Sequence, residues 1–248
     1  MNSNRSRLLA VIVIIFVASF VIEYYTNKQF PEEEVVVKTL PEYKTGELNT
    51  FSFIRQGMTV GNFSYILEKN VSGYSVSTST EVEYEGKTTQ IESSYQFGAT
   101  MNPLDYFVHI DSGGEITDIE CEFTESQVLT TVDFKNQTIN LETDLPENVL
   151  LVENNMPGYW ELILQTLELK PDIRYKLRVF IPQAADVFTI TLTVDDNPVN
   201  LNIEGVDYEC QRIREVDRQY TFLLYEGHLL EFKDDGQEIS FRKHLVEN

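Results

Sequence analysis

Residues that commonly carry catalysis are scarce in this sequence, which has three histidines and two cysteines among 248 residues. It contains no H-E-x-x-H, C-x-x-C or G-x-S-x-G motif and no P-loop. His109 and Asp111 lie two apart on a predicted strand, but such a pair is more often incidental than catalytic. We therefore predict a protein without catalytic residues, metal site or cofactor, and a hydrolase-like enzyme is the least favoured alternative.

Basic residues are also few, because the chain has 19 Lys and Arg against 40 Asp and Glu, a formal net charge of −21. Proteins that bind nucleic acid cluster Lys and Arg on one surface, where they contact phosphates. The sequence has no such cluster, so we predict no nucleic-acid partner. Hydrophobic residues make up 42% of the chain, which is enough for a folded core.

Long apolar runs are missing except at the N-terminus, where residues 8–22 read LLAVIVIIFVASFVI after Arg5 and Arg7. Fifteen helical residues span about 22 Å, and extension to Tyr25 gives about 27 Å, close to a hydrocarbon core of about 30 Å. We predict a signal-anchor helix over residues 1–25, with the N-terminus cytoplasmic and the main domain outside the membrane. The alternative is a signal peptide that is cleaved, which would leave a secreted protein.

The segment that follows, residues 26–46, has two prolines, a run of three glutamates (Glu32–Glu34) and no sustained periodicity. This composition predicts a tether in which the glutamates are solvated. The remaining residues, 47–248, are predicted to form one extracytoplasmic antiparallel β domain.

An extracytoplasmic domain can carry disulfides and glycans. We predict that Cys121 and Cys210 pair, and two buried free cysteines are the alternative. Three N-x-S/T sequons permit N-glycosylation. They begin at Asn62, Asn70 and Asn136.

The stretch FSFIRQGMTVGNFSYILEKN, residues 51–70, contains Gly57 and Gly61 four apart, a spacing that marks helix pairs in membranes. Apolar residues alternate with polar ones on both sides of the glycines, which is the period of β-strands. We therefore predict a β-hairpin whose turn is bounded by the two glycines.

The same alternation continues to the C-terminus. Residues 74–84 place Tyr74, Val76, Thr78, Thr80, Val82 and Tyr84 on one face and serines and glutamates on the other. One wet and one dry face is typical of an antiparallel sheet, and similar segments predict about twelve strands. One helix is predicted over residues 157–169, capped by Asn155 and stopped by Pro171.

A flat sheet of twelve strands would be about 55 Å wide, whereas a helix is about 10–12 Å in diameter. One helix therefore cannot cover the dry face unless the sheet curls. We predict a mainly β fold, a strongly curved antiparallel sheet or half-barrel plugged by the helix, with an N-terminal transmembrane helix. The alternative is a two-layer β-sandwich.

Several segments resemble an exported envelope β-sheet domain of unknown function. They are the first hairpin, the stretch PLDYF at 103–107, and the predicted helix followed by the long strand IRYKLRVFI. That domain is similar in turn to the LolA/LolB-type lipoprotein carriers, so the resemblance implies a curled sheet plugged by a helix that holds acyl chains. It transfers no catalytic residue, and this chain lacks the N-terminal cysteine of the lipoprotein members.

These features favour a non-catalytic, membrane-anchored extracytoplasmic binding or structural accessory protein that holds an apolar ligand. Its expected partners are the membrane and a lipid or protein of the envelope. The alternative is a lipid or lipoprotein carrier of the LolA/LolB type. Aromatic residues on the dry face are the candidate lining of an apolar cavity, and a filled core is the other interpretation of them. They are Phe51, Phe53, Phe63, Tyr65, Tyr95, Phe97 and Trp160.

Overall fold

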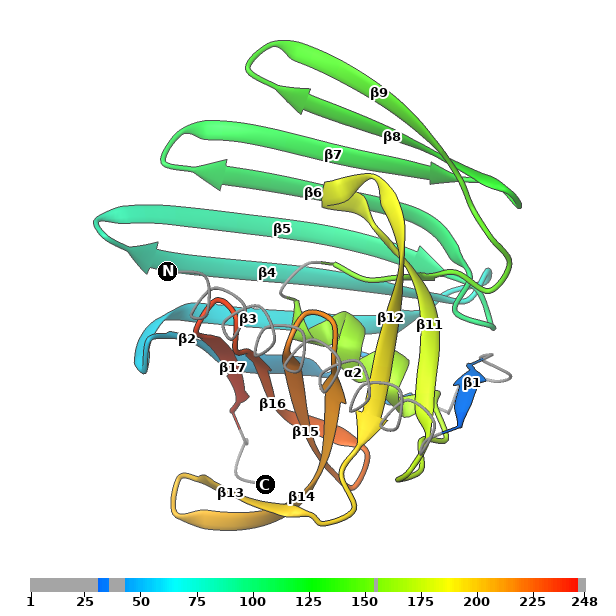
Figure 1. Ribbon diagram of the computed structural model, residues 1–248. Helices are drawn as coiled ribbons and strands as arrows, with labels where there is room; N and C mark the ends of the chain where they lie inside the picture. The colour runs from blue at the N-terminus through cyan, green and yellow to red at the C-terminus, as the bar shows by residue number, and fades with distance from the viewer. Residues whose placement is uncertain (1–30, 36–42, 154–155, 245–248) are drawn as a thin grey trace, which may run out of the picture.

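The computed structural model describes residues 31–35, 43–153 and 156–244, which form one large, mainly antiparallel β-sheet around a short helix (Figure 1). The described residues contain one α-helix, α2 (Pro157–Gln165), and one 3-10 helix, η1 (Pro182–Ala184). The strands are β1 (Glu32–Glu34), β2 (Leu48–Arg55), β3 (Met58–Lys69), β4 (Tyr74–Tyr84), β5 (Lys87–Phe97), β6 (Pro103–Ser112), β7 (Glu115–Phe123), β8 (Gln127–Phe134), β9 (Gln137–Asp144), β10 (Leu150–Leu151), β11 (Arg174–Ile181), β12 (Asp186–Val194), β13 (Val199–Ile203), β14 (Val206–Glu215), β15 (Tyr220–Tyr225), β16 (His228–Asp234) and β17 (Ile239–Lys243).

The mainly β class with one helix is confirmed, but the described residues form seventeen strands rather than about twelve. Two of the additional strands, β1 and β10, have three and two residues. A strand of that length is too short for its alternation to be recognised in a sequence.

Most of the sheet is a meander in which each strand pairs antiparallel with the next. We call β2 to β9 the first arm and β11 to β17 the second arm. The pairing of β17 with β2 joins the two arms, and β1 and β10 lie parallel to β11. Because the sheet is continuous, the alternative of two separate sheets in a sandwich is wrong.

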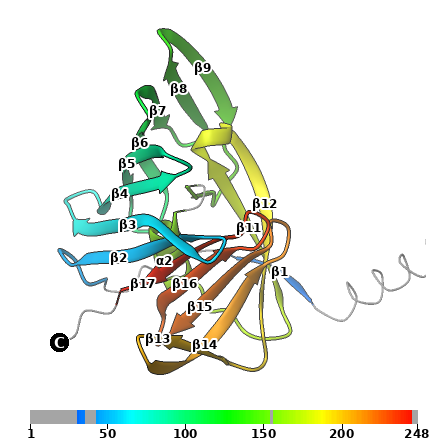
Figure 2. The same ribbon diagram turned by 90° about the vertical axis from the view of Figure 1, so that its left-hand side faces the viewer.

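The sheet bends around α2, which lies on its concave side (Figure 2). We call this side the inner face. Eight of the nine residues of α2 are buried. The arms also touch near η1, where Gln183 donates a hydrogen bond to the Tyr106 hydroxyl at 3.0 Å. The Thr143 hydroxyl on β9 donates to the Ala185 carbonyl at 2.8 Å. The helix is therefore enclosed by strands of both arms.

The predicted dry face is the inner face. In β4, Val76, Thr78 and Thr80 are buried, while the serines between them and the two glutamates that follow are exposed. Cross-strand pairing places inner-face residues in rows that run across the first arm. One row consists of Tyr65, Thr78, Ser93, Val108, Ile119, Val132 and Ile139. The first five are buried, Val132 is half-buried and Ile139 is 49% exposed, so burial ends at the β9 edge.

The first hairpin forms as predicted, but its turn is shorter. It consists of Gln56 and Gly57, which both have positive φ (50° and 77°). Gly61 lies inside β3 instead of bounding the turn. A Cβ atom at Gly61 would lie 2.0 Å from the Glu81 carbonyl oxygen on β4, so glycine permits a close approach of two strands here.

The helix also differs from the prediction at both ends. Its N-cap is Met156, which makes no side-chain cap hydrogen bond, so the predicted cap at Asn155 is wrong, and Asn155 lies outside the described residues. The helix ends at Gln165 and not at 169. Thr166 closes it, because the Thr166 hydroxyl donates to the Ile163 carbonyl at 2.7 Å.

The predicted anchor over residues 1–25 lies outside the described residues. Within the part of the chain that the structure describes, no helix is long and apolar enough to cross a membrane. The predicted tether includes β1, which pairs with β11. Its glutamates are exposed, as expected, but Glu32 and Glu34 contact Lys176 and Arg178 at 2.6 and 2.8 Å.

The predicted disulfide is wrong, because Cys121 and Cys210 are both free and buried. Cys121 belongs to the main core under the inner face. Cys210 belongs to a second, smaller core, in which the β13–β14 hairpin packs against Leu223 and Leu230 of β15 and β16. The two thiols therefore belong to separate hydrophobic clusters, and burial raises the pKa of Cys121 to about 12.

Candidate binding site

Six of the seven aromatic residues predicted to line a cavity are at most 4% exposed, and Phe53 is partly buried. Their rings contact one another and their neighbours. The centroids of Phe51 and Phe63 are 5.8 Å apart, and those of Tyr95 and Phe97 are 5.1 Å apart. The ring centroids of Trp160 on α2 and Phe222 of the second arm are 4.7 Å apart. These rings fill the space between sheet and helix, which corresponds to the filled-core interpretation.

Tyr65 differs from the other six because it also lines a cleft where α2 meets both arms. This first cleft has a volume of about 380 Å³. Strands β2 and β3 form one wall, α2 the floor, and the beginning of β16 with the end of β17 the other wall. Its lining residues include Tyr43, Lys44, Leu48, Tyr65, Leu67, Glu161, Leu162, Gln165, His228 and Lys243.

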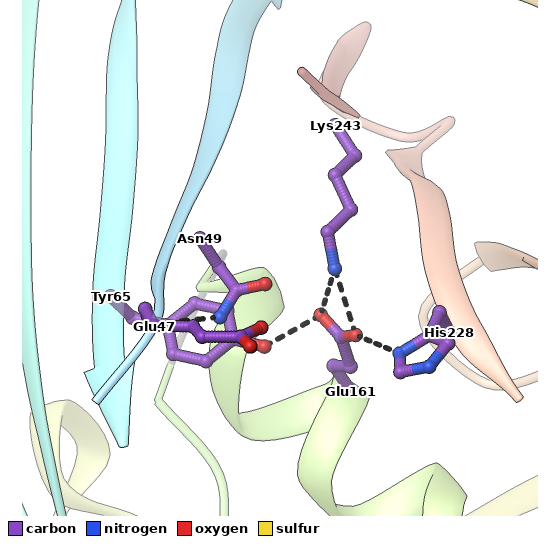
Figure 3. Close-up of polar contacts among 6 residues, drawn as sticks. All are labelled: Glu47, Asn49, Tyr65, Glu161, His228 and Lys243. Atoms are coloured by element: carbon purple, nitrogen blue, oxygen red, sulfur yellow. Dashed lines mark hydrogen bonds and ion pairs between the residues drawn. The ribbon is translucent and has the colours of Figure 1, made fainter. Parts of the chain in front are cut away.

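Glu161 lies at the centre of this cleft and is 1% exposed (Figure 3). The Tyr65 hydroxyl donates to its Oε2 atom at 2.7 Å. Lys243 Nζ lies 3.0 Å from Oε1 and 3.3 Å from Oε2, so it bridges both carboxylate oxygens. His228 Nδ1 lies 3.4 Å from Oε1. The side chains come from β3, from α2 and from the consecutive strands β16 and β17, so three separate parts of the chain meet here.

The partners of Glu161 keep it charged. Burial by itself raises the pKa of this carboxyl, because a charge is costly in a low-dielectric site. The hydrogen bond with His228, the charge of Lys243 and the hydrogen bond from Tyr65 act in the opposite direction and prevail. The pKa of Glu161 therefore lies below its usual value, and the cleft contains a buried ion pair at neutral pH.

A second cleft of about 470 Å³ adjoins the first. The two clefts share four lining residues, Tyr43, Lys44, Gln165 and His228. We call the combined depression the end groove, since it runs past the C-terminal end of α2. The second cleft is richer in aliphatic side chains, which are Leu164, Leu167, Leu169, Ile213 and Leu224. The end groove is therefore polar around Glu161, whereas its other end combines these aliphatic side chains with Glu168, Gln211 and Glu226.

A second buried carboxylate, Glu153, precedes α2 and is fully buried. It accepts hydrogen bonds from the Ser93 hydroxyl at 2.8 Å and from the Tyr106 hydroxyl at 3.1 Å. Tyr159 also hydrogen-bonds to it. Burial raises the pKa of Glu153 to about 7, and the three hydroxyl groups offset only part of that cost. Glu153 connects the segment before α2 to β5 and β6, and we assign it a structural role.

The remaining polar candidates lie apart from one another. His109 Nδ1 is 2.6 Å from Asp118 across the β6–β7 pair, whereas the Asp111 carboxylate accepts a hydrogen bond from the Gly114 amide. Ser52 Oγ and His244 Nε2 lie 2.6 Å apart at an exposed position. No group of three or more His, Cys, Asp or Glu among the described residues could hold a metal ion.

The three sequon asparagines are exposed. Asn62 lies on β3, Asn70 accepts two hydrogen bonds from Ser72 after the end of that strand, and Asn136 lies in the β8–β9 turn.

Sequence reasoning missed Glu161 and Glu153, although one signal for Glu161 was present. Glu161 stands between Trp160 and Leu162 in a short helix that is apolar on most sides. An acidic residue in a fully buried helix is buried as well, and it then needs a cation. Lys243 is 82 residues away in the chain, so the sequence does not reveal which basic residue pairs with Glu161.

Comparisons with known proteins give little information about this chain. No family model matches the chain, and no curated protein does. One solved structure, a DUF1089 family protein from Pseudomonas aeruginosa, matches with a TM-score of 0.42 and 10% sequence identity. The match covers 82% of this chain and 97% of that one. A likeness this distant carries no functional inference.

Proposed function

We propose that this protein is a non-catalytic binding protein that holds a small amphiphilic ligand in the end groove. Residues 1–25 are proposed to anchor it in a membrane with the β domain outside. The observation that carries the proposal is the composition of the end groove, with a buried ion pair at one end and a cluster of aliphatic side chains bordered by polar ones at the other. Ligand sites are mostly apolar, with a few fixed polar groups that orient the ligand.

At the polar end the donors are less occupied than the Glu161 carboxylate, and the other carboxylate of the lining, Glu47, is exposed to solvent. Each oxygen of Glu161 already accepts two contacts, from Lys243 and His228 on Oε1 and from Tyr65 and Lys243 on Oε2. A carboxylate has about four acceptor sites, so little capacity remains. Lys243 has three N–H donors, and His228 is 56% exposed. The ligand's polar group is therefore expected to accept hydrogen bonds, as a hydroxyl, carbonyl or acid does.

The same geometry favours binding over catalysis. Glu161 is charged but fully occupied, so it has no free lone pair with which to remove a substrate proton. The Ser52–His244 pair is exposed, and no described carboxylate hydrogen-bonds to His244 to orient its ring. The site consequently resembles a recognition site.

A lipid or lipoprotein carrier of the LolA/LolB type is the second candidate. The sheet that bends around α2 supports it, because a half-barrel plugged by a helix is the arrangement that the sequence resemblance implies (Figure 2). A carrier needs space for acyl chains under the sheet. The contacts among the buried aromatic rings favour the first proposal over this one.

Native mass spectrometry of the full-length protein, purified from membranes in a mild detergent, tests the proposal. Gln165 lies where the two clefts meet, so Gln165→Trp should fill the end groove and remove a bound mass. Gln96→Trp, on the exposed face of β5, is the matched control. A ligand seen in the wild type and in Gln96→Trp but lost in Gln165→Trp supports the proposal. A bare mass for the wild type contradicts it.

A further inference from the structure

The free edge of the sheet is at β9. In the described part of the chain, β9 is the last strand and pairs only with β8, in register from Gln137 to Asp144. Natural edge strands avoid pairing with other chains through charged side chains, especially lysine, and through proline, bulges or short length. β9 has eight residues, QTINLETD, and contains no lysine or proline. Its register with β8 has no bulge.

The opposite end of the sheet is protected in the usual way. There β1 has three residues, all glutamates, and two of them contact Lys176 and Arg178. A short, strongly charged strand is a poor template for another chain. The two ends differ in length and in charge: β9 is longer than β1, and its only charged residues, Glu142 and Asp144, lie near its C-terminal end.

Apolar side chains gather beside the same edge. Ile139 and Leu141 of β9 are on the inner face and are 49% and 42% exposed. They lie opposite Val132 and Thr130 of β8, which are half-buried and buried. Ile139 and Leu141 therefore end two neighbouring cross-strand rows whose inner members are buried, and both rows stop at the edge of the sheet. Another strand at this edge would continue both the hydrogen-bonded ladder and the apolar face.

We propose that this strand is β9 of a second copy, paired antiparallel about a two-fold axis at Asn140. This register places Ile139 opposite Leu141 of the second copy, and the symmetry repeats the contact. Thr138 lies opposite Glu142, and Asn140 opposite itself. Because no carboxylate faces another across the pair, the β9 edge is complementary to itself, whereas a register centred on Glu142 would place like charges opposite.

The overall charge modulates this dimer. Two chains of net charge −21 repel each other, and salt screens the repulsion over a Debye length of about 10 Å at 0.1 M. The apolar contacts and ladder hydrogen bonds are much less sensitive to salt. Association is therefore expected to strengthen as ionic strength rises.

Cysteine cross-linking of the full-length protein tests the register. In Asn140→Cys the two introduced thiols face each other across the two-fold axis, within the Cα separation below about 7 Å that a disulfide allows. In Leu129→Cys, on the outer face of β8, they would be about 20 Å apart, because three strand spacings separate them across the sheet and four residues along it. The native thiols, Cys121 and Cys210, are buried. We expect Asn140→Cys, and not Leu129→Cys, to form a covalent dimer on oxidation.

Sedimentation velocity of the wild type and two lysine variants provides a second measurement. Leu141→Lys and Leu129→Lys change leucines that are each 42% exposed, on opposite faces of neighbouring strands. We expect the wild type and Leu129→Lys to sediment as dimers, more completely at high salt, and Leu141→Lys to sediment as a monomer. A wild type that stays monomeric at high salt overturns the proposal. So does a dimer that survives Leu141→Lys, or equal cross-linking of the two cysteine variants.

Discussion

Glu153 lies just before α2 and Glu161 within it, and both are buried, but their partners differ in kind. Three hydroxyl groups, from Ser93, Tyr106 and Tyr159, surround Glu153, and burial raises its pKa to about 7. Lys243 and His228, together with one tyrosine hydroxyl, surround Glu161 and hold its pKa below the usual value. Neutral donors satisfy hydrogen bonds, but only cations offset the cost of burying the charge.

Because their partners differ, the two glutamates have different roles. Glu153, enclosed by hydroxyl groups, joins the segment before α2 to the first arm and can lose its charge near neutral pH. Glu161 stays charged and fixes Lys243 at the polar end of the end groove.

The largest effect is expected from Lys243→Met, because it leaves the charge of Glu161 buried and poorly compensated. Breaking a buried ion pair costs about 3–5 kcal/mol. Urea unfolding at pH 7 should show a loss of that size. Lys135→Met, which breaks a pair with Glu115 on the surface, is the control and should cost less than about 1 kcal/mol. Equal losses in the two variants would mean that Glu161 does not depend on Lys243.

The second effect concerns Glu153 and pH. Its pKa is about 7 in the folded protein against 4.5 for an exposed glutamate, so the folded state binds the proton more tightly. The free energy of unfolding should therefore fall as pH rises from 4.5 to 7, by up to about 3 kcal/mol from this group. Glu153→Gln cannot titrate and should lack that decline, which urea unfolding at several pH values would measure.

Glu161 should affect the pH dependence of the unfolding free energy in the opposite direction, and the same urea experiment measures it. Its folded pKa is lowered, so it contributes stability above pH 4.5 and loses that stability as pH falls through the folded value. Glu161→Gln cannot titrate, so its free energy of unfolding should lack the decline that Glu161 causes in the wild type as pH falls below 4.5. If Glu153→Gln and Glu161→Gln flattened the same pH range, the contrast between the two sites would fail.

A smaller effect is expected from Tyr65→Phe, which removes the hydroxyl that donates to Glu161 at 2.7 Å. A hydrogen bond to a charged group contributes about 1.5–3 kcal/mol. Tyr95→Phe is the matched control, because the buried Tyr95 hydroxyl donates to the neutral Met101 carbonyl at 3.3 Å. Thermal unfolding should show the larger loss for Tyr65→Phe, and the reverse order would contradict the account.

The smallest effect is expected from His228→Asn. The contact of His228 with Glu161 is 3.4 Å long and the imidazole is 56% exposed, whereas Lys243 is closer and 13% exposed. Exposed ion pairs contribute about 0–1 kcal/mol. Urea unfolding at pH 7 should show a loss within that range, and a loss as large as that of Lys243→Met would assign the main role to the histidine.

The sheet was predictable because strands and turns are specified by residues that are neighbours in the sequence. Alternation in β4 specifies which of Val76, Ser77 and Thr78 turn inward, and the structure buries Val76 and Thr78. Turn residues such as Gly57 mark hairpins in the same local way. The role of Gly61 was not predictable, because it depends on the approach of Glu81 from the next strand.

The candidate site was much less predictable, since its groups come together only through the bend of the sheet. Glu161 meets Tyr65 and Lys243 from the first and last parts of the domain. Aromatic residues on the dry face suggested a cavity, but alternation gives the face of a side chain and not the space left beside it. The same limit explains the wrong disulfide. Alternation placed Cys121 and Cys210 on strands, but it did not show that the two strands belong to separate parts of the core.

The most direct test is a carbon-13 NMR titration of the glutamate carboxyl groups, with Glu153→Gln and Glu161→Gln used to assign the two signals. The account predicts that the Glu153 signal titrates near pH 7 and that the Glu161 signal titrates below pH 4.5. Coincident titrations near pH 4.5, or a Glu161 signal that titrates above that of Glu153, would contradict it.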